Sequence, residues 1–262
     1  YIGEEEPEGN YLEFYKMLGI GEEQLIHIEK PARFQKVFVP EAGFRPCIWY
    51  TEEYQRMFDQ MVESVLEDKD LKEKFKDIKK IYFSRKQFSK AAATEFGEKY
   101  IEQCFNQNGY ESLGPETLTL REQIYVWNHA EAIACMNGTI PLNVVFCKNE
   151  ELKLTILNKM SIYHKNPYIY LYMRNIQAEF IDIYKEPLKG YPKSLGEGPY
   201  LIKAGKEFFD YCQREKFEIP YTGMKLKFYD LKQEIRYYLC VIGIRNKIRR
   251  VGLYIKRKML RR

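Results

Sequence analysis

Two short stretches of the chain carry groups that could bind an anion. The first is the turn 137–139, Asn-Gly-Thr, which follows the apolar run 132–136 and precedes a proline that favours the first turn of a helix. An Asn-Gly pair accepts positive φ and turns the chain sharply, while Gly138 lets an anion approach the backbone and Thr139 adds a hydroxyl. A strand, a turn of small residues and a helix start predict backbone N–H groups aimed at a phosphate, with Asn143 bracing the turn.

The second stretch is Ser84-Arg85, directly after the apolar residues 81–83 of a predicted buried strand. An arginine just past the end of a strand can hold two oxygens of a diphosphate with its planar guanidinium. Each pattern also has a structural interpretation, because Asn-Gly junctions commonly serve as turns and an arginine at a strand end commonly forms a surface salt bridge. The anion-binding hypothesis therefore requires that the fold bring both stretches to one edge of a sheet.

Hydrophobic periodicity predicts the elements that would position these residues. Strand and helix signals alternate from about residue 46 to 215, which is typical of a parallel α/β sheet with helices on its faces. A capping box, Thr119-x-x-Glu122, begins the helix that carries Gln123, and Glu95 opens another helix. The expected strands are 25–28, 36–39, 78–84, 110–113, 132–136, 153–163 and 178–184, and the expected helices are 10–18, 51–65, 95–107, 119–129 and 201–212.

Composition favours a globular protein with a substantial core, since 45% of the 262 residues are hydrophobic and 30% are charged. No run reaches the ~18 apolar residues of a membrane span.

The six cysteines show no paired spacing, which favours reduced core thiols over disulfides or a zinc site. Asp68-x-Asp70 spells a metal-binding motif but lies in a charged helical run, so we expect a solvated face and no metal. Residue 1 is Tyr rather than Met, and we expect a processed or trimmed piece.

The C-terminal end differs in charge from the rest of the chain. The net charge is +5, yet residues 236–262 contain ten Arg and Lys and no Asp or Glu, so the remainder is acidic on balance. Apolar positions among these cations predict a basic amphipathic helix on an anionic membrane surface, at about 1 kcal/mol per cation close to the lipid. The alternatives are a helix packed on the acidic body and a solubilising tail. Charge alone would also allow nucleic acid binding, but no basic and aromatic interleaving supports it.

In order and spacing, the motifs between about residues 79 and 147 resemble those of the family-61 glycosyltransferases, once called DUF563. The motifs are a strand ending in Ser-Arg, a Glu that opens a helix, a helix ending its first turn in Glu-Gln, and a strand that runs into a Gly-bearing turn with a later Asn. They stand here as Tyr82-Phe83-Ser84-Arg85, Thr94-Glu95, Leu118-Thr119-Leu120-Arg121-Glu122-Gln123 and Asn137-Gly138-Thr139-Ile140-Pro141-Leu142-Asn143. Asn137 replaces the family's usual His, so the resemblance is to a divergent bacterial branch.

The resemblance implies a GT-B-like fold of three parts. Residues 46–215 would form a Rossmann-like, nucleotide-sugar-binding domain with a parallel sheet. Residues 1–45 would be a truncated or small N-terminal α/β part, the remnant or end of an acceptor-side domain, and residues 216–262 the basic amphipathic tail. The protein would be cytoplasmic and peripheral on the inner face of the plasma membrane.

The resemblance further implies a glycosyltransferase of polysaccharide or capsule biosynthesis. The enzyme would move a sugar from a nucleotide-sugar, expected to be a UDP-sugar, to a polysaccharide or lipid-linked glycan acceptor. The reaction would be inverting and metal-independent, with no cofactor beyond the donor substrate. The alternative is a non-catalytic nucleotide-sugar-binding or scaffold protein of a polysaccharide assembly complex, which the departure at Asn137 favours.

The resemblance also assigns roles to single residues. Arg85 would neutralise the diphosphate leaving group, and the turn from Asn137 to Asn143 would supply N–H donors. Glu95 would hold ribose hydroxyls, and Gln123 would contact the base or brace the turn. The catalytic base is expected from the acceptor domain, so no catalytic residue is assigned. The predicted donor-binding residues are Arg85, Glu95, Gln123, Asn137, Gly138, Thr139 and Asn143.

Overall fold

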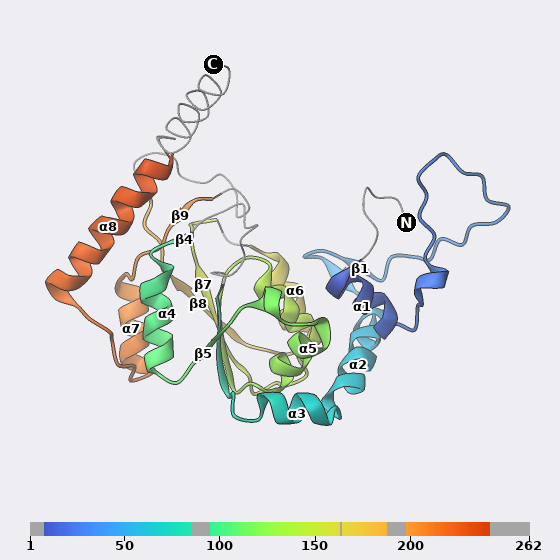
Figure 1. Cartoon of the computed structure of the whole chain (residues 1–262), viewed down its shortest axis with the longest axis horizontal. Coiled ribbons are helices and arrows are strands. Elements are labelled where there is room, and N and C mark those ends of the chain that lie inside the picture. Colours follow the sequence, from blue (N-terminus) through green and yellow to red (C-terminus); the bar gives the residue numbers. More distant parts are fainter. Residues whose placement is uncertain (1–7, 85–94, 163, 188–197, 242–262) are drawn as a thin grey trace, which may run out of the picture.

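The computed structural model describes residues 8–84, 95–162, 164–187 and 198–241. Its central strands are β3 (Lys80–Phe83), β5 (Glu111–Leu113), β6 (Ala132–Met136), β7 (Lys153–Asn158) and β8 (Ala178–Asp182). They form one five-stranded sheet in the order β5-β3-β6-β7-β8, and every neighbouring pair runs parallel (Figure 1). The predicted parallel α/β sheet is therefore confirmed.

Helices cover both faces of this sheet, which is why its strands are apolar on both sides. Phe83 and Ile156 belong to the core of one face, and Tyr82 and Leu157 to the core of the other. The first core is completed by α2 (Glu52–Leu66), α3 (Lys69–Phe75), α5 (Leu120–His129), the 3-10 helix η3 (Ile140–Phe146) and α6 (Asn166–Met173). The second is completed by α4 (Glu98–Gln107), α7 (Lys206–Arg214) and the start of α8 (Gly223–Val241).

The order of the strands reverses between β3 and β6. From β3 the chain crosses to β5 on one side, then returns to β6 on the other side of β3, and β7 and β8 follow outward. In open α/β sheets, ligands bind at the carboxyl ends of the two strands that flank such a reversal. The register pairs Phe83 with Cys135, so β3 and β6 end side by side at that edge.

Side-chain caps begin the helices where the sequence predicts them. Thr51 Oγ1 accepts a hydrogen bond from the N–H of Tyr54 at 3.2 Å, at the start of α2. At the start of α5, Thr119 Oγ1 accepts from the N–H of Glu122 at 3.2 Å, and Glu122 Oε2 accepts from the N–H of Thr119 at 2.8 Å. This capping box fixes the first turn of α5 and with it the position of Gln123.

The N-terminal part lacks the expected sheet. Helix α1 (Gly9–Met17) packs on the main core through Phe14, as predicted for an amphipathic helix. The strands expected at 25–28 and 36–39 are wrong, because within residues 8–51 the only sheet is the hairpin of β1 (Phe44–Arg45) and β2 (Trp49–Tyr50). Their alternating apolar residues have no sheet to pack on, and Phe38 and Val39 are 80% and 84% exposed.

A second small sheet lies beside the carboxyl edge of the main one. Strand β4 (Glu95–Phe96) pairs in parallel with β9 (Tyr200–Leu201), so the expectation that Glu95 opens a helix is wrong. The helix begins only after Gly97, whose φ is +106°. A Cβ at Gly97 would lie 2.1 Å from the carbonyl oxygen of Ile202, so the close approach of the two strands requires glycine here.

Helix α8 begins earlier than the basic helix that the sequence predicts, and its residue Tyr237 is buried against Phe96 and Leu201. Residues 242–262, which hold nine of the ten C-terminal cations, lie outside the described residues. No helix in the described part of the chain has both the length and the apolarity to cross a bilayer. The division into parts 1–45, 46–215 and 216–262 stays a prediction.

All six cysteines fall within the described residues and are free thiols. Cys104, Cys135, Cys147 and Cys212 are buried in the two cores, as expected for core thiols, whereas Cys47 is exposed. Burial raises the pKa of Cys147 to about 11, which keeps that thiol protonated and unreactive at neutral pH.

We expect Glu122→Gln to destabilise the fold at neutral pH and to have little effect in acid. Burial opposes ionisation of Glu122, but hydrogen bonds from Lys74 and from the N–H of Thr119 prevail and hold the pKa of this carboxyl below its ordinary value. A carboxyl whose pKa is depressed by folding stabilises the fold above its unfolded pKa and loses that effect as the pH falls through its folded pKa.

Thermal unfolding of both proteins between about pH 3 and pH 7 measures this, and the gap in Tm should close toward the acid end. The control is Glu73→Gln, which removes an exposed carboxylate that pairs with Lys76 within the adjoining turn. A gap for Glu122→Gln that is the same at every pH would contradict the prediction.

Candidate functional site

The candidate site lies at the carboxyl ends of β3 and β6, where the strand order reverses. Ser84 follows β3, and its N–H donates to the carbonyl of Leu113 at 2.9 Å, so the chain is still held to β5 as it leaves the sheet. Arg85 comes next in the sequence, but residues 85–94 lie outside the described residues. The structure thus brings together the strand end before Arg85 and the strand end before Asn137.

The turn 137–139 leaves β6 without the positive φ that the Asn-Gly pair predicts, since neither Asn137 nor Gly138 lies in the left-handed region. Gly138 instead lies beside open space, because a Cβ at this position would have no other atom within 4 Å. The N–H of Asn137 is bound to the carbonyl of Leu157 at 2.8 Å. Among the described residues, the N–H groups of Gly138 and Thr139 have no hydrogen-bond partner, so two adjacent donors border an open space.

The element after the turn, where Pro141 predicts the start of a helix, is η3, a 3-10 helix of seven residues. Its Pro141 occupies the first turn as predicted, and Thr139 precedes it without a side-chain cap. The short 3-10 geometry means that the donors at this turn are its own free N–H groups rather than the dipole of a long helix.

His164 lies against the turn, and sequence reasoning missed it. Its Nδ1 is 3.0 Å from the carbonyl oxygen of Gly138, and because a carbonyl only accepts, the imidazole donates. The peptide group is planar and trans, so fixing the carbonyl of Gly138 toward His164 aims the N–H of Thr139 in the opposite direction. The signal available in the sequence was the position of His164 in the loop after the next predicted strand, which must end at the same edge.

Three side chains link the ends of β6, β7 and β8. Asn158 Nδ2 donates to Asp182 Oδ1 at 2.8 Å, and Asn137 Nδ2 donates to Asn158 Oδ1 at 2.8 Å. Because a carboxylate accepts and cannot donate, Asp182 fixes the direction of both amides. Asn137 is 1% exposed, and its Oδ1 has no hydrogen-bond partner within the residues that the structure describes.

Glu95 lies at the same edge but is already engaged. Its Oε1 is 2.9 Å from Nζ of Lys159, the residue after β7, and the two side chains are 4% and 1% exposed. Lys159 Nζ also lies 4.2 Å from the centre of the Tyr200 ring. Breaking one side of a buried ion pair typically costs about 3–5 kcal/mol, so Glu95 has a structural role here whatever else it contacts.

A cavity of about 310 Å³ opens beside the turn and brings three of the predicted residues together. Gln123 is buried and donates from Nε2 to two carbonyl oxygens, while its Oε1 accepts from Asn143 Nδ2 at 2.9 Å. Gln123 thus holds the amide of Asn143, while its predicted role, contacting the base or bracing the turn, stays a prediction. The cavity is lined by Asn10, Pro115, Glu116, Gln123, Thr139, Ile140 and Asn143.

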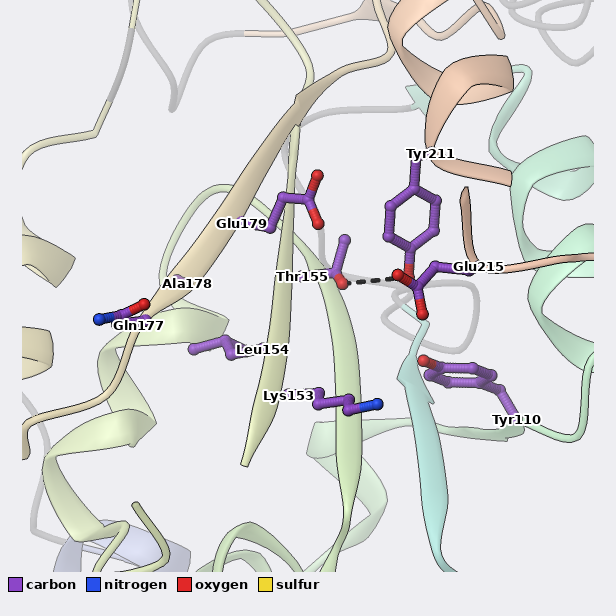
Figure 2. Close-up of a pocket in the computed structure, with 9 residues that line it drawn as sticks. All are labelled: Tyr110, Lys153, Leu154, Thr155, Gln177, Ala178, Glu179, Tyr211 and Glu215. Carbon is purple, nitrogen blue, oxygen red and sulfur yellow. Dashed lines mark hydrogen bonds between the residues drawn. The ribbon is translucent and has the colours of Figure 1, made fainter. Parts of the chain in front are cut away.

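A second hollow, of about 320 Å³, lies at the opposite edge of the sheet, where β7 and β8 begin (Figure 2). Figure 2 shows Thr155 and Tyr211 facing each other across it, with their hydroxyl oxygens 3.2 Å apart. Burial raises the pKa of Tyr211 and Tyr110, so both phenols stay neutral. None of the predicted donor-binding residues that the structure describes lines this hollow.

The Asp68-x-Asp70 motif has a structural explanation. Asp68 caps α3 by accepting from the N–H groups of Asp70 and Leu71, and it also pairs with Arg121 at 3.0 Å. The Arg121 guanidinium and these N–H groups hold the pKa of Asp68 below its usual range. Within the described residues, no three His, Cys, Asp or Glu side chains gather closely enough to hold a metal ion.

Comparison with known proteins gives one family. A sequence profile of the family described as Glycosyltransferase 61 matches residues 24–155, half of the chain. The matched range contains all seven predicted donor-binding residues as well as β3, β6 and the turn between β6 and η3. None of the curated proteins compared with the chain matches it.

We expect Asn158→Asp to destabilise the fold by about 2–3 kcal/mol at neutral pH, because it replaces a buried donor by a carboxylate next to Asp182. The loss should shrink near pH 4, where one proton can be shared between the two carboxyls. Denaturant unfolding at both pH values measures it. Asn106→Asp is the matched control, because the exposed Asn106 Oδ1 accepts from Ser112 and aspartate preserves that bond. Equal, small effects of both substitutions would contradict the proposed direction of the amides.

Proposed function

The chain belongs to glycosyltransferase family 61, and from that premise we propose that it transfers a sugar from a nucleotide-sugar to a polysaccharide or lipid-linked glycan. Membership supports glycosyl transfer in general. The finer proposal, with a UDP-sugar as donor, is supported by the cavity and the turn at the strand reversal, since both lie where α/β sheets bind nucleotides.

One observation supports the donor site more than any other. The ends of β3 and β6 lie side by side, and the turn after β6 presents the N–H groups of Gly138 and Thr139, which have no partner in the described part of the chain, beside open space. We propose that the donor's diphosphate occupies that space. Arg85, which the family resemblance assigns to the diphosphate, follows the neighbouring strand end by two residues but lies outside the described residues.

The proposed reaction is a single displacement with inversion. An acceptor hydroxyl oxygen forms a bond to the anomeric carbon, the bond from that carbon to the diphosphate oxygen breaks, and its electron pair leaves with the nucleoside diphosphate. The hydroxyl proton passes to a base, which we assign to the acceptor side. N–H donors at Gly138 and Thr139 oppose the charge that develops on the leaving group, as would the Arg85 cation, so the proposal needs no metal ion.

We propose a GT-B arrangement in which residues 46–215 bind the donor and residues 1–45 end an acceptor-side domain. The exposure of Phe38 and Val39, in a segment with a strand pattern and no strand partner in the described residues, supports an origin in a second sheet. A donor-binding protein without turnover is the competing hypothesis. Release of nucleoside diphosphate from UDP-sugars in the presence of glycan acceptors separates the two.

We expect Gly138→Ala to fold normally and to weaken nucleoside diphosphate binding at least fivefold. The φ of Gly138 is not positive and a Cβ there meets no atom, so the methyl group fits the protein but occupies the space proposed for the phosphate. Calorimetric titration with UDP, GDP and CMP-sugars, together with Tm, measures both effects.

Gly205→Ala is the matched control, because a Cβ at Gly205 also meets nothing and the residue lies at the start of α7. Unchanged affinity of the Gly138→Ala protein would place the phosphate elsewhere. If the unaltered chain binds no nucleotide at all, the proposed function is wrong.

We also propose that the protein associates with the cytoplasmic face of a membrane through α8 and the basic segment after it. The outer face of α8 carries an apolar stripe at helical spacing, 44–65% exposed: Met224, Phe228, Leu231, Ile235 and Leu239. Asp230 and Glu234 pair with Lys203 and Lys185 of the body, whereas Lys227 and Lys232 have no partner among the described residues. Apolar side chains flanked by free cations fit an anionic lipid surface.

We expect Phe228→Ser/Leu231→Ser to lower binding to vesicles containing about 30% phosphatidylserine by at least tenfold, because burial of each side chain in lipid contributes about 1.5–3 kcal/mol. Nucleotide affinity should not change. The control, Val37→Ser/Val39→Ser, removes two apolar side chains that are at least as exposed but belong to the N-terminal segment and not to α8. Vesicle cosedimentation measures the effect, and equal binding of both double variants would refute this role of α8.

A further inference from the structure

The direction of the Asn143 amide follows from its neighbours. Gln123 Nε2 lies 3.1 Å from the carbonyl oxygen of Pro115 and 3.2 Å from that of Leu118, and carbonyl oxygens only accept. This end of Gln123 must therefore be the nitrogen, and Gln123 Oε1 must accept from Asn143 Nδ2 at 2.9 Å. The remaining Asn143 Oδ1 has no partner among the described residues, and Asn143 lines the cavity beside the turn.

Of the other polar residues that line the cavity, Asn10 and Glu116 have the same character, whereas Thr139 adds a hydroxyl on the side of the turn. Asn10 donates from Nδ2 to the carbonyl of Leu118, which leaves its Oδ1 as an acceptor. Glu116 adds an exposed carboxylate with no partner in the described part of the chain. No Lys, Arg or His is among the described residues that line the cavity. A diphosphate, which carries negative charge and only acceptors, would meet a carboxylate and unmatched acceptors there.

The opposite end of the turn repeats the pattern independently. Asp182 orients Asn158, Asn158 orients Asn137, and Asn137 Oδ1 is left buried without a donor. A buried acceptor without a donor costs about 1–3 kcal/mol. The side chains at both ends of the segment 137–143 thus offer acceptors, whereas its backbone at Gly138 and Thr139 offers donors.

We propose that the cavity binds the hydroxyl-bearing part of the donor, with Asn143 Oδ1 accepting a hydrogen bond from a hydroxyl, while the diphosphate stays on the backbone of the turn. This inference rests on the proposed function and divides its site into two chemically distinct halves. The hydroxyl group belongs to the ribose or to the transferred sugar, both of which present hydroxyl donors. Asn143 is accordingly a specificity residue for hydroxyls and not a phosphate ligand.

Calorimetric titration of the full chain with pyrophosphate, UDP, 2′,3′-dideoxy-UDP and UDP-glucose tests the inference. Loss of one hydrogen bond of about 1.4 kcal/mol corresponds to a tenfold loss of affinity. Asn143→Ala should weaken binding of UDP or UDP-glucose about tenfold and change pyrophosphate binding less than twofold. If the ribose is the source, the dideoxy compound should bind the unaltered protein about tenfold more weakly than UDP, and Asn143→Ala should weaken it no further. A loss confined to UDP-glucose identifies the transferred sugar.

The matched control is Gln177→Ala, which removes an amide from the hollow at the opposite edge of the sheet and should change no affinity. Equal losses for pyrophosphate and UDP in Asn143→Ala would overturn the inference, and so would unaltered affinity of the variant for every probe. The dideoxy arm uses the unaltered protein, so it does not depend on how the variant folds. If the unaltered chain binds none of the probes, both the proposed function and this inference are wrong. If Asn143→Ala loses equal affinity for pyrophosphate and UDP, only this inference is wrong.

Discussion

The parallel pairing of β3 with β6 is the constraint on which the candidate site depends. Strands that are separated by about fifty residues, with β5 between them in sequence, end side by side because both run parallel in one sheet. The helices that come after them, α4 and η3, pack on opposite faces of the sheet, and ligands of such folds bind at strand ends of this kind. The cores on the two faces hold this pairing, and β6, which is buried along its whole length, has no freedom to slip in register.

At the carboxyl edge of the sheet, the direction of the hydrogen bonds decides which ligand groups can bind, a role that charge has in many anion sites. The carboxylate of Asp182 orients the amides of Asn158 and Asn137, and the carbonyls of Pro115 and Leu118 orient those of Gln123 and Asn143. Among the described residues, Oδ1 of Asn137 and Oδ1 of Asn143 are left without a donor. Such networks are stable only when each member has one orientation, because a flipped amide would set acceptor against acceptor in a buried setting. The segment from Asn137 to Asn143 therefore has a defined polarity before any ligand arrives, which lowers the cost of ordering it on binding.

The sequence predicted those features that are encoded locally. The strand 132–136 is buried on both faces and the Thr119–Glu122 box needs only its own neighbours, so both were found. The segment 36–39 has an equally good strand pattern. A strand also needs a neighbouring strand to pair with, and the sequence of one segment does not show whether such a neighbour exists. His164 and the linked side chains of Asn158 and Asp182 escaped prediction because their roles arise from strands that become neighbours only in the sheet. Those site residues from the family resemblance that the structure describes lie toward one edge of the sheet, yet the contacts that orient them could not be deduced from spacing.

The Asn137-Gly138 peptide carries a chemical liability that follows from the same geometry. Asparagine followed by glycine is prone to spontaneous deamidation, in which the backbone nitrogen of the glycine attacks the side-chain carbonyl carbon, and here that N–H has no hydrogen-bond partner among the described residues to hold it. Loss of ammonia leaves a cyclic imide, and its hydrolysis by water gives a carboxylate. The carboxylate of an aspartate at position 137 would face Asn158 Oδ1, whose orientation Asp182 does not permit to change. Ageing of the purified protein would thus set two oxygens against each other at the end of β6, and the one-dalton gain in mass would mark the molecules in which this edge of the sheet has been damaged.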